Sequence, residues 1–238
     1  MRILIAFAAA VVLLTSGCMD AGNVTAPDMT RDLTSMTDKK PELIKLPEPR
    51  LSGNMSLEEA LRSRRSVREY ADGPLELEEI SQLLWSAQGE TASWGGRTAP
   101  SAGALYPLEV YLIAGYVNGL DNGIFKYVPQ GHELTLHKEG DVLAKLQAAA
   151  LGQSSIGEAA VDILIAAAFE RTAARYGERA ARYIYMEAGH AAQNICLQAT
   201  ALGLGTVPIG AFNDKLVSKV VGLPANEDPL YILPVGRQ

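Results

Sequence analysis

Residues 185–212 read YMEAGHAAQNICLQATALGLGTVPIGAF and carry the clearest structural signal in the chain. Apolar and small residues recur every three or four positions through the longer run 171–202, which predicts a central helix packed on several sides. A Gly-Leu-Gly turn ends this helix. Residues 206–211 then form a short strand, and Pro208 places it at a sheet edge or a bulge because proline cannot donate a ladder hydrogen bond.

The rest of the folded chain mixes helices and strands without regular alternation. Ser56 and Glu59 form a capping-box pattern that begins a helix. Apolar residues at helical spacing predict further helices at 77–88, 141–150 and 213–221. Apolar and β-branched runs predict strands at 109–114, 123–128, 133–137, 161–169 and 231–235. Such an irregular order is typical of an α+β fold rather than a doubly wound sheet.

The N-terminal residues have the pattern of an export signal. A single basic residue, Arg2, precedes an unbroken apolar run at 3–14, which is too short to span a membrane as a stable helix. Small residues follow, as at a secretory cleavage site, and then Cys18, an arrangement that resembles the bacterial lipobox. We therefore predict a lipoprotein-type signal peptide at 1–18, with Cys18 as the lipidated residue. An ordinary signal peptide with a chance cysteine is the alternative.

Two further regions complete the predicted organisation. Residues 19–50 are polar and contain prolines without apolar periodicity, so they predict a flexible tether. Residues 51–238 are long enough for one domain with a sizeable core. Signal and tether together predict an exported protein anchored to a membrane by lipid, on the periplasmic side or at the cell surface.

Charge and side-chain composition exclude several classes of partner. The formal net charge is −6 and no Lys/Arg-rich run occurs, which argues against nucleic acid. The three histidines lack metal-ligand spacing with acids or cysteines, so we predict no metal site. Cys196 is the only cysteine besides Cys18, so lipidation of Cys18 leaves no disulfide within the chain. An organic cofactor is then the expected source of chemistry.

A basic run near residue 65 is a candidate phosphate site. Three guanidinium groups and one hydroxyl lie within five residues, and such groups hold phosphate through charge-assisted, bidentate hydrogen bonds. These residues are Arg64, Arg65, Ser66 and Arg68. The alternative is a solvated basic helix end, which the helix macrodipole also favours.

Three further segments offer backbone groups and a terminal cation. Residues 100–107 (PSAGALYP) and 203–210 (GLGTVPIG) are rich in small residues, which allow the backbone to approach a flat ligand closely. The final PVGR at 234–237 places an arginine directly after a strand. A structural turn is the alternative interpretation of 100–107.

Taken together and in this order, the segments resemble the nitroreductase superfamily of FMN enzymes, in particular its SagB/ThcOx-type dehydrogenase branch. The resemblance covers residues 55–238 and is carried by RRSVREY at 64–70, SAGALYP at 101–107, the opening stretch at 185–212 and LPVGR at 233–237. It implies a nitroreductase-like α+β fold with a mixed, mostly antiparallel sheet surrounded by helices. It also implies an obligate homodimer with FMN at the interface.

The resemblance also implies roles for individual residues. The FMN phosphate and ribityl chain would be held by Arg64, Ser66 and Arg68, with Arg65 between them and Arg237 as a second phosphate cation. The isoalloxazine would lie near Pro100, Ser101 and Gly103. Its other side, where N5 receives hydride, would be lined by Pro208, Ile209 and Gly210.

One departure from the branch concerns a catalytic pair. Azoline-oxidising members use a Lys-Tyr pair shortly before the central helix, whereas this chain has Arg175 and Tyr176 there. An arginine does not readily give up a proton, so the substitution argues against azole formation. Tyr176 remains a candidate catalytic residue, and it is a candidate for shaping the acceptor pocket together with Tyr106 and Trp94. Core packing is the alternative for each.

The sequence therefore favours an FMN-dependent oxidoreductase that works by a ping-pong cycle between a small-molecule electron donor and an acceptor. The cofactor supplies the hydride chemistry, which explains why no side-chain triad is visible. Two alternatives stay open. One is a peptide-azoline dehydrogenase, and the other is a lipoprotein that binds flavin or another planar ligand without turnover.

Overall fold

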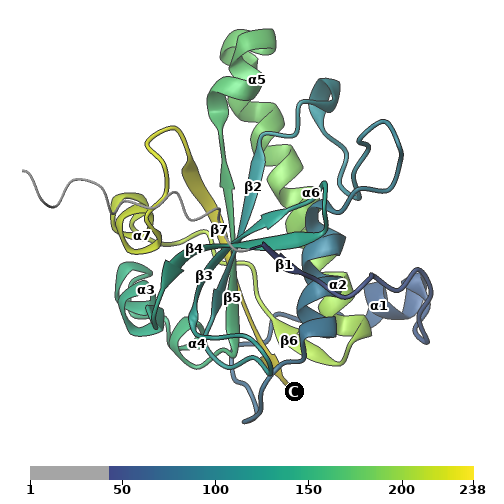
Figure 1. Ribbon diagram of the computed structural model, residues 1–238, viewed down its shortest axis with the longest axis vertical. Helices are drawn as coiled ribbons and strands as arrows, with labels where there is room; N and C mark the ends of the chain where they lie inside the picture. The colour runs from purple at the N-terminus through teal and green to yellow at the C-terminus, as the bar shows by residue number, and fades with distance from the viewer. Residues whose placement is uncertain (1–42) are drawn as a thin grey trace, which may run out of the picture. The chain divides into compact units, whose positions relative to one another are not determined.

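The computed structural model describes residues 43–238, which fold around a seven-stranded sheet with the strand order β1-β4-β3-β2-β5-β7-β6 (Figure 1). All six neighbouring strand pairs are antiparallel. The mostly antiparallel sheet implied by the resemblance is therefore present, but it is not mixed. The strands are β1 (Leu43–Lys45), β2 (Leu108–Ala114), β3 (Gly123–Val128), β4 (Glu133–Glu139), β5 (Val161–Ala167), β6 (Leu204–Thr206) and β7 (Asp228–Arg237).

Helices cover both faces of this sheet (Figure 1). One face carries α1, α2 and α6, and the other carries α3, α4 and α7. The helices are α1 (Leu57–Ser63), α2 (Leu77–Gln88), α3 (Leu143–Ala149), α4 (Ser154–Gly157), α5 (Phe169–Tyr176), α6 (Ala180–Ala201) and α7 (Asp214–Val221), with 3-10 turns η1 (Ala102–Ala104) and η2 (Gly177–Arg179). None of the helices in residues 43–238 is long and apolar enough to cross a membrane.

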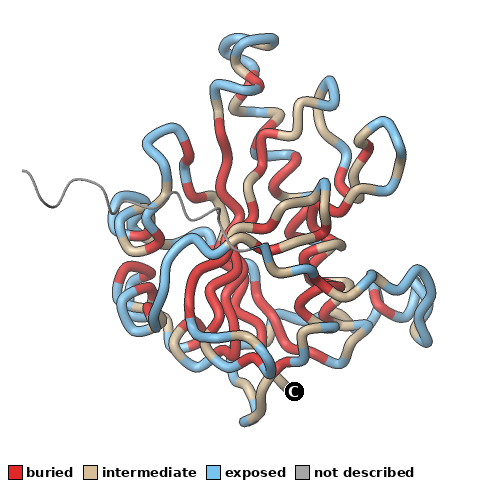
Figure 2. Tube along the Cα trace, in the orientation of Figure 1, coloured by how far each residue is buried: buried red, intermediate tan, exposed pale blue. Residues whose placement is uncertain are grey.

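The central strand β5 explains why the core has two halves. Every residue of β5 is buried (Figure 2), because its side chains alternate between two covered faces. Ile163 and Ile165 pack toward α2 and α6 in one apolar cluster, whereas Leu164 and Ala166 pack toward α3 and α7 in the other. The predicted buried strand is therefore confirmed, as is the α+β class.

The long helix expected at 171–202 is two helices. The chain breaks at Gly177, whose φ of +52° is a conformation that other residues rarely adopt. Helix α5 ends at Tyr176, and α6 then begins at Ala180 after the turn η2. The predicted apolar face of α6 is confirmed, because Ile184 and Ile195 are fully buried.

The strand expected at 206–211 lies earlier, at Leu204–Thr206. The chain leaves the sheet beyond Thr206, and Pro208 is exposed. Ile209 returns to the sheet as a single bridge, exchanging two backbone hydrogen bonds of 2.8 and 2.9 Å with Ile232. The predicted edge position is confirmed, since β6 is the last strand of the sheet.

The predicted tether extends too far into the fold. Residues 43–45 pair with β4, and Leu46 is only 2% exposed. The Leu46 amide donates to the carbonyl of His132, and the Ser81 hydroxyl donates to that of Pro47. The apolar alternation here spans only a few residues, too few to produce a periodic signal. Cys18 and most of the predicted tether lie outside the described residues.

Candidate active site

The basic segment at 64–70 is anchored by its two apolar residues. Val67 donates a 3.0 Å backbone hydrogen bond to Thr206 and packs against Gly205, where a Cβ added to the glycine would lie 2.7 Å from a Val67 methyl group. Tyr70 packs against Gly236 in the same way, at 2.6 Å from the position of a Cβ. Both positions therefore require glycine, because a larger residue would prevent the close approach of the Val67 and Tyr70 side chains to the strands. The segment is fixed to β6 through Val67 and to β7 through Tyr70.

This anchoring leaves the polar side chains of the segment on the surface. Arg65, Ser66 and Arg68 are exposed, and Arg64 is half-buried. Among the described residues, neither Arg64 nor Arg68 forms an ion pair. Arg65 turns back and donates to the carbonyls of Arg62 and Arg64 at the end of α1. Within residues 43–238, two guanidinium groups without ion pairs and one exposed hydroxyl are therefore available to bind a phosphate.

Arg237 is placed differently from the other predicted phosphate ligands. Its guanidinium forms a bidentate ion pair with Glu79, at 2.6 and 2.8 Å, and also donates to the Pro74 carbonyl. The charge is therefore compensated within the chain. This pairing argues against a role for Arg237 as a second phosphate cation.

The loop at 100–106 has an unusual backbone. Gly103, Ala104 and Tyr106 have φ values of +63°, +53° and +46°. Positive φ is costly for residues other than glycine, and such residues concentrate at functional sites. The Ser101 hydroxyl accepts a 2.9 Å hydrogen bond from the Tyr106 amide and closes the loop. This is the loop that the sequence places near a flat ligand.

Gly103 packs against the end of α5. A Cβ at this position would lie 2.8 Å from the Tyr176 hydroxyl and 2.9 Å from Arg175 Nη1. The Tyr176 ring packs edge-on against Tyr183, with the ring centroids 5.1 Å apart. The structure therefore brings the Arg175-Tyr176 pair into contact with the loop that contains Ser101.

A buried carboxyl lies beneath this loop. Glu187 of α6 is only 2% exposed, and its Oε1 has no hydrogen-bond partner. Burial raises the pKa of Glu187 to about 7, against the lowering effects of a hydrogen bond with Ser101 and of the Arg97 and Arg171 charges. Sequence reasoning missed this residue. The available signal was a single acid between Ile184 and Ala188 on the buried face of a helix.

Gly210 reaches the same part of α6. It lines a cavity of about 340 Å³ together with Tyr185 and Ala188. Arg64 lies near the other end of the helix, because its charge lowers the pKa of Cys196, although burial raises that pKa overall. Cys196 lies nine positions after Glu187, roughly 13 Å along the helix and on its opposite side. Gly210 and Arg64 therefore lie near different parts of α6.

Residues 61–237 match the nitroreductase family. The chain belongs to that family. A Methanocaldococcus jannaschii protein described as a candidate nitroreductase is 46% identical over 184 residues, which cover 77% of this chain and 92% of the relative. Two solved structures of candidate nitroreductases, from Ralstonia eutropha and Anabaena variabilis, are 32% and 31% identical, each with a TM-score of 0.73. The match with the Ralstonia eutropha structure covers 82% of this chain and 89% of that chain. The match with the Anabaena variabilis structure covers 83% of this chain and 42% of that chain.

As a nitroreductase-family protein, the chain is an oxidoreductase whose substrate these relatives do not identify. Among residues 43–238, no three His, Cys, Asp or Glu side chains gather as metal ligands would. Trp94, a candidate for the acceptor pocket, is 73% exposed. Tyr106, another candidate, accepts a 3.2 Å hydrogen bond from the Arg97 amide, and the Arg97 guanidinium lies over its ring.

Proposed function

We propose that this nitroreductase-family protein binds FMN and transfers electrons between a small-molecule donor and an acceptor. The observation that carries the proposal is the unpaired cationic row of Arg64 and Arg68 beside the exposed Ser66 hydroxyl. These groups suit a phosphate. When bound, FMN supplies the hydride-transfer chemistry.

The remaining segments fit the flat part of such a cofactor. Pro100, Ser101 and Gly103 offer a backbone that can approach a ring closely, because Gly103 lacks a side chain. Pro208 and Gly210 are exposed, and Ile209 between them is hydrogen-bonded to Ile232 of β7. These two loops would contact the ring, and burial raises the pKa of Glu187, beside Ser101, to about 7, so that this carboxyl can take up or release a proton near neutral pH.

Turnover, rather than binding alone, is supported by the two aromatic residues near the loop. A sealed site would need Trp94 or Tyr106 to fill the acceptor space. Trp94 is exposed to solvent, and Tyr106 is held by Arg97. We place the protein in the SagB/ThcOx-type branch on its sequence motifs. Arg175 in place of lysine disfavours azoline oxidation within that branch.

A homodimer with FMN at the interface is part of the proposal. Leu57 and Leu61 of α1 are 61% and 54% exposed, directly before the basic segment. On the neighbouring α6, Tyr185 and Met186 are 57% and 48% exposed. Apolar surface of this kind beside a ligand site is typical of a face that a second subunit covers.

The test is a comparison of FMN with riboflavin, which lacks the phosphate. The wild-type protein is expected to bind FMN more tightly than riboflavin. Arg64→Gln and Arg68→Gln are each expected to weaken FMN binding about tenfold, with little effect on riboflavin, since a charge-assisted hydrogen bond contributes about 1.5–3 kcal/mol. Quenching of flavin fluorescence during titration gives both affinities.

The control for these variants is Arg62→Gln, which removes an exposed cation of α1 just before the basic segment. It is expected to leave the preference for FMN unchanged. Equal binding of FMN and riboflavin by the wild-type protein would contradict the phosphate assignment. Absence of any flavin binding would overturn the proposed function.

We also propose that the protein is exported and anchored by lipid on Cys18. The support is the lipobox-like end of the signal peptide. Cys18→Ala is expected to abolish incorporation of a clickable palmitate analogue and to release the protein from the membrane fraction. Cys196→Ala, a variant of the buried cysteine, is the matched control and is expected to retain both. Labelling of the Cys18→Ala protein would refute the anchor.

A further inference from the structure

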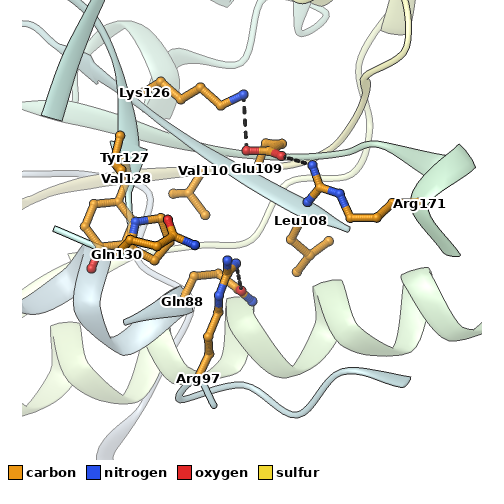
Figure 3. A pocket seen from close by; sticks show the side chains of 11 residues that line it. Gln88, Arg97, Leu108, Glu109, Val110, Lys126, Tyr127, Val128, Gln130 and Arg171 are labelled. Carbon is orange, nitrogen blue, oxygen red and sulfur yellow. Dashed lines mark hydrogen bonds and ion pairs between the residues drawn. The ribbon is translucent and has the colours of Figure 1, made fainter. Parts of the chain in front are cut away.

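A cavity of about 320 Å³ lies between Arg97, Glu109 and Arg171 (Figure 3). Its walls come from the end of α2, the start of β2, the end of β3 with the following turn, and α5. Cavities that bind small molecules begin at about this size. No residue assigned above to phosphate or ring binding lines it.

Two of the three cations in this cavity are already neutralised. Lys126 contacts Glu109 at 3.1 Å and Glu227 at 2.9 Å. Arg171 contacts the same Glu109 at 2.5 Å and also donates to the Tyr106 carbonyl. These groups form a closed network along one wall (Figure 3). Because these two cations are paired with carboxylates, they offer little net positive charge to a ligand.

Arg97 is the cation that remains uncompensated. Among the described residues it forms no ion pair, although Glu90 and Glu109 lie near enough to act on its charge. Burial lowers the pKa of Arg97, as expected when a cation loses water without gaining a counter-ion. A bound anion would give Arg97 the direct ion-pair partner that the described residues do not supply.

Two buried donors on this wall also lack acceptors. Gln88 is only 1% exposed, and its Oε1 accepts a 3.0 Å hydrogen bond from Arg97 Nη1. This contact leaves Gln88 Nε2 and Arg97 Nε buried, and no residue of the described part of the chain accepts a hydrogen bond from either. An unsatisfied buried donor costs about 1–3 kcal/mol. A ligand oxygen would remove this cost, and Figure 3 shows the Gln88 and Arg97 side-chain ends side by side at the cavity.

We propose that this cavity is a binding site for a small carboxylate, whose oxygens accept hydrogen bonds from Gln88 and Arg97. The single uncompensated cation matches one carboxylate rather than a doubly charged phosphate. The volume admits only a small molecule, and Leu108, Val110 and Val128 give it a short apolar wall. None of the residues proposed to hold phosphate or to contact the ring lines the site, although Arg97 and Arg171 join it to Tyr106 of the 100–106 loop. Binding there requires no redox step.

The experiment is a calorimetric titration of the FMN-saturated protein with butyrate, and with butyramide as the neutral isostere. Butyrate is expected to bind at one site per chain, and butyramide at least about tenfold more weakly, because it cannot neutralise Arg97. Gln88→Glu is expected to weaken butyrate binding at least about tenfold. That variant keeps the acceptor for Arg97 but replaces the free donor by a second oxygen.

Lys145→Gln is the matched control, because it lowers the net charge by the same amount at an exposed position of α3. It is expected to bind butyrate within about twofold of the wild-type protein. If Gln88→Glu does not fold, Arg97→Lys keeps the charge but loses the guanidinium donors, and it is expected to weaken binding severalfold. Saturable butyrate binding that survives both cavity variants would overturn the proposal, as would the absence of binding.

Discussion

Replacing Gly103 by valine is expected to abolish tight FMN binding while the sheet stays folded. Valine is strained at a φ of +63°, and its Cβ would overlap the Tyr176 hydroxyl and the Arg175 guanidinium. The ends of the Tyr176 and Arg175 side chains must then shift, and the strained backbone at position 103 favours a different loop conformation. Because the same loop carries Ser101, the proposed ring site moves with it.

The size of this effect follows from two costs. A left-handed backbone costs a residue with a Cβ about 1–2 kcal/mol, and overpacking typically costs about 1–3 kcal/mol. Backbone strain alone raises the FMN dissociation constant at least about fivefold, and the full overpacking cost raises it several thousandfold. Titration of flavin fluorescence measures it, and circular dichroism verifies the fold.

Gly119 provides the matched control for Gly103. It has a similar φ of +78°, but nothing lies within 4 Å of the position that a Cβ would occupy. Gly119→Val therefore carries the backbone strain without the contact, and it is expected to bind FMN normally. Normal binding by Gly103→Val, or equal loss in both variants, would show that the loop does not form the ring site.

Glu187→Gln is expected to make the folded protein more stable at pH 8 and to leave its stability nearly unchanged at pH 4. The amide keeps the shape of the side chain and can still accept from Ser101. The carboxyl has a pKa of about 7 in the folded protein, above its ordinary value of 4.5. The two values set the pH window of the effect.

The sign follows from proton binding. Below pH 4.5 the carboxyl is protonated in both the folded and the unfolded state. Folding then buries a neutral group, so there is no penalty for desolvating a charge. Between pH 4.5 and 7 only the unfolded state ionises, so stability falls as the pH rises. Above pH 7 the full penalty of about 3 kcal/mol is present, at about 1.4 kcal/mol for each pKa unit. Glutamine removes this penalty.

Urea unfolding at pH 4, 6 and 8 measures the effect. Glu178→Gln, at an exposed position of η2, is the control and is expected to show the wild-type profile. Asp162 is fully buried, and burial also raises its pKa, so some pH dependence is expected to remain in Glu187→Gln. A variant that is no more stable than the wild-type protein at pH 8 would contradict the burial of a charged Glu187.

The sheet and its flanking helices could be predicted from apolar periodicity, because that pattern reports burial. The helix at 77–88 and the strand at 123–128 have the predicted bounds. The break at Gly177 could not be predicted, since α5 and α6 pack against each other and their apolar spacing continues across it. Strand β1 has three residues, too few for any period.

The candidate site was predictable where residues are neighbours in sequence, as at Arg64 and Arg68. The site was not predictable for residues whose interaction partners are distant in the sequence and are brought close only by folding. Arg237 is paired with Glu79, 158 positions away. Glu187 lies between the buried Ile184 and Ala188, but its partner Ser101 comes from the distant 100–106 loop, which only folding brings to it.

The anchoring of Val67 to the last strand has a consequence for solubility. Strand β6 ends the sheet, and an open strand edge can recruit another chain into a growing aggregate. The Val67 amide donates a hydrogen bond to the Thr206 carbonyl, which is then not free to pair with another chain. The packing of Val67 on Gly205 holds the segment in place. The segment that carries the proposed phosphate ligands therefore also covers this sheet edge, through Val67, and protects the molecule from edge-to-edge association.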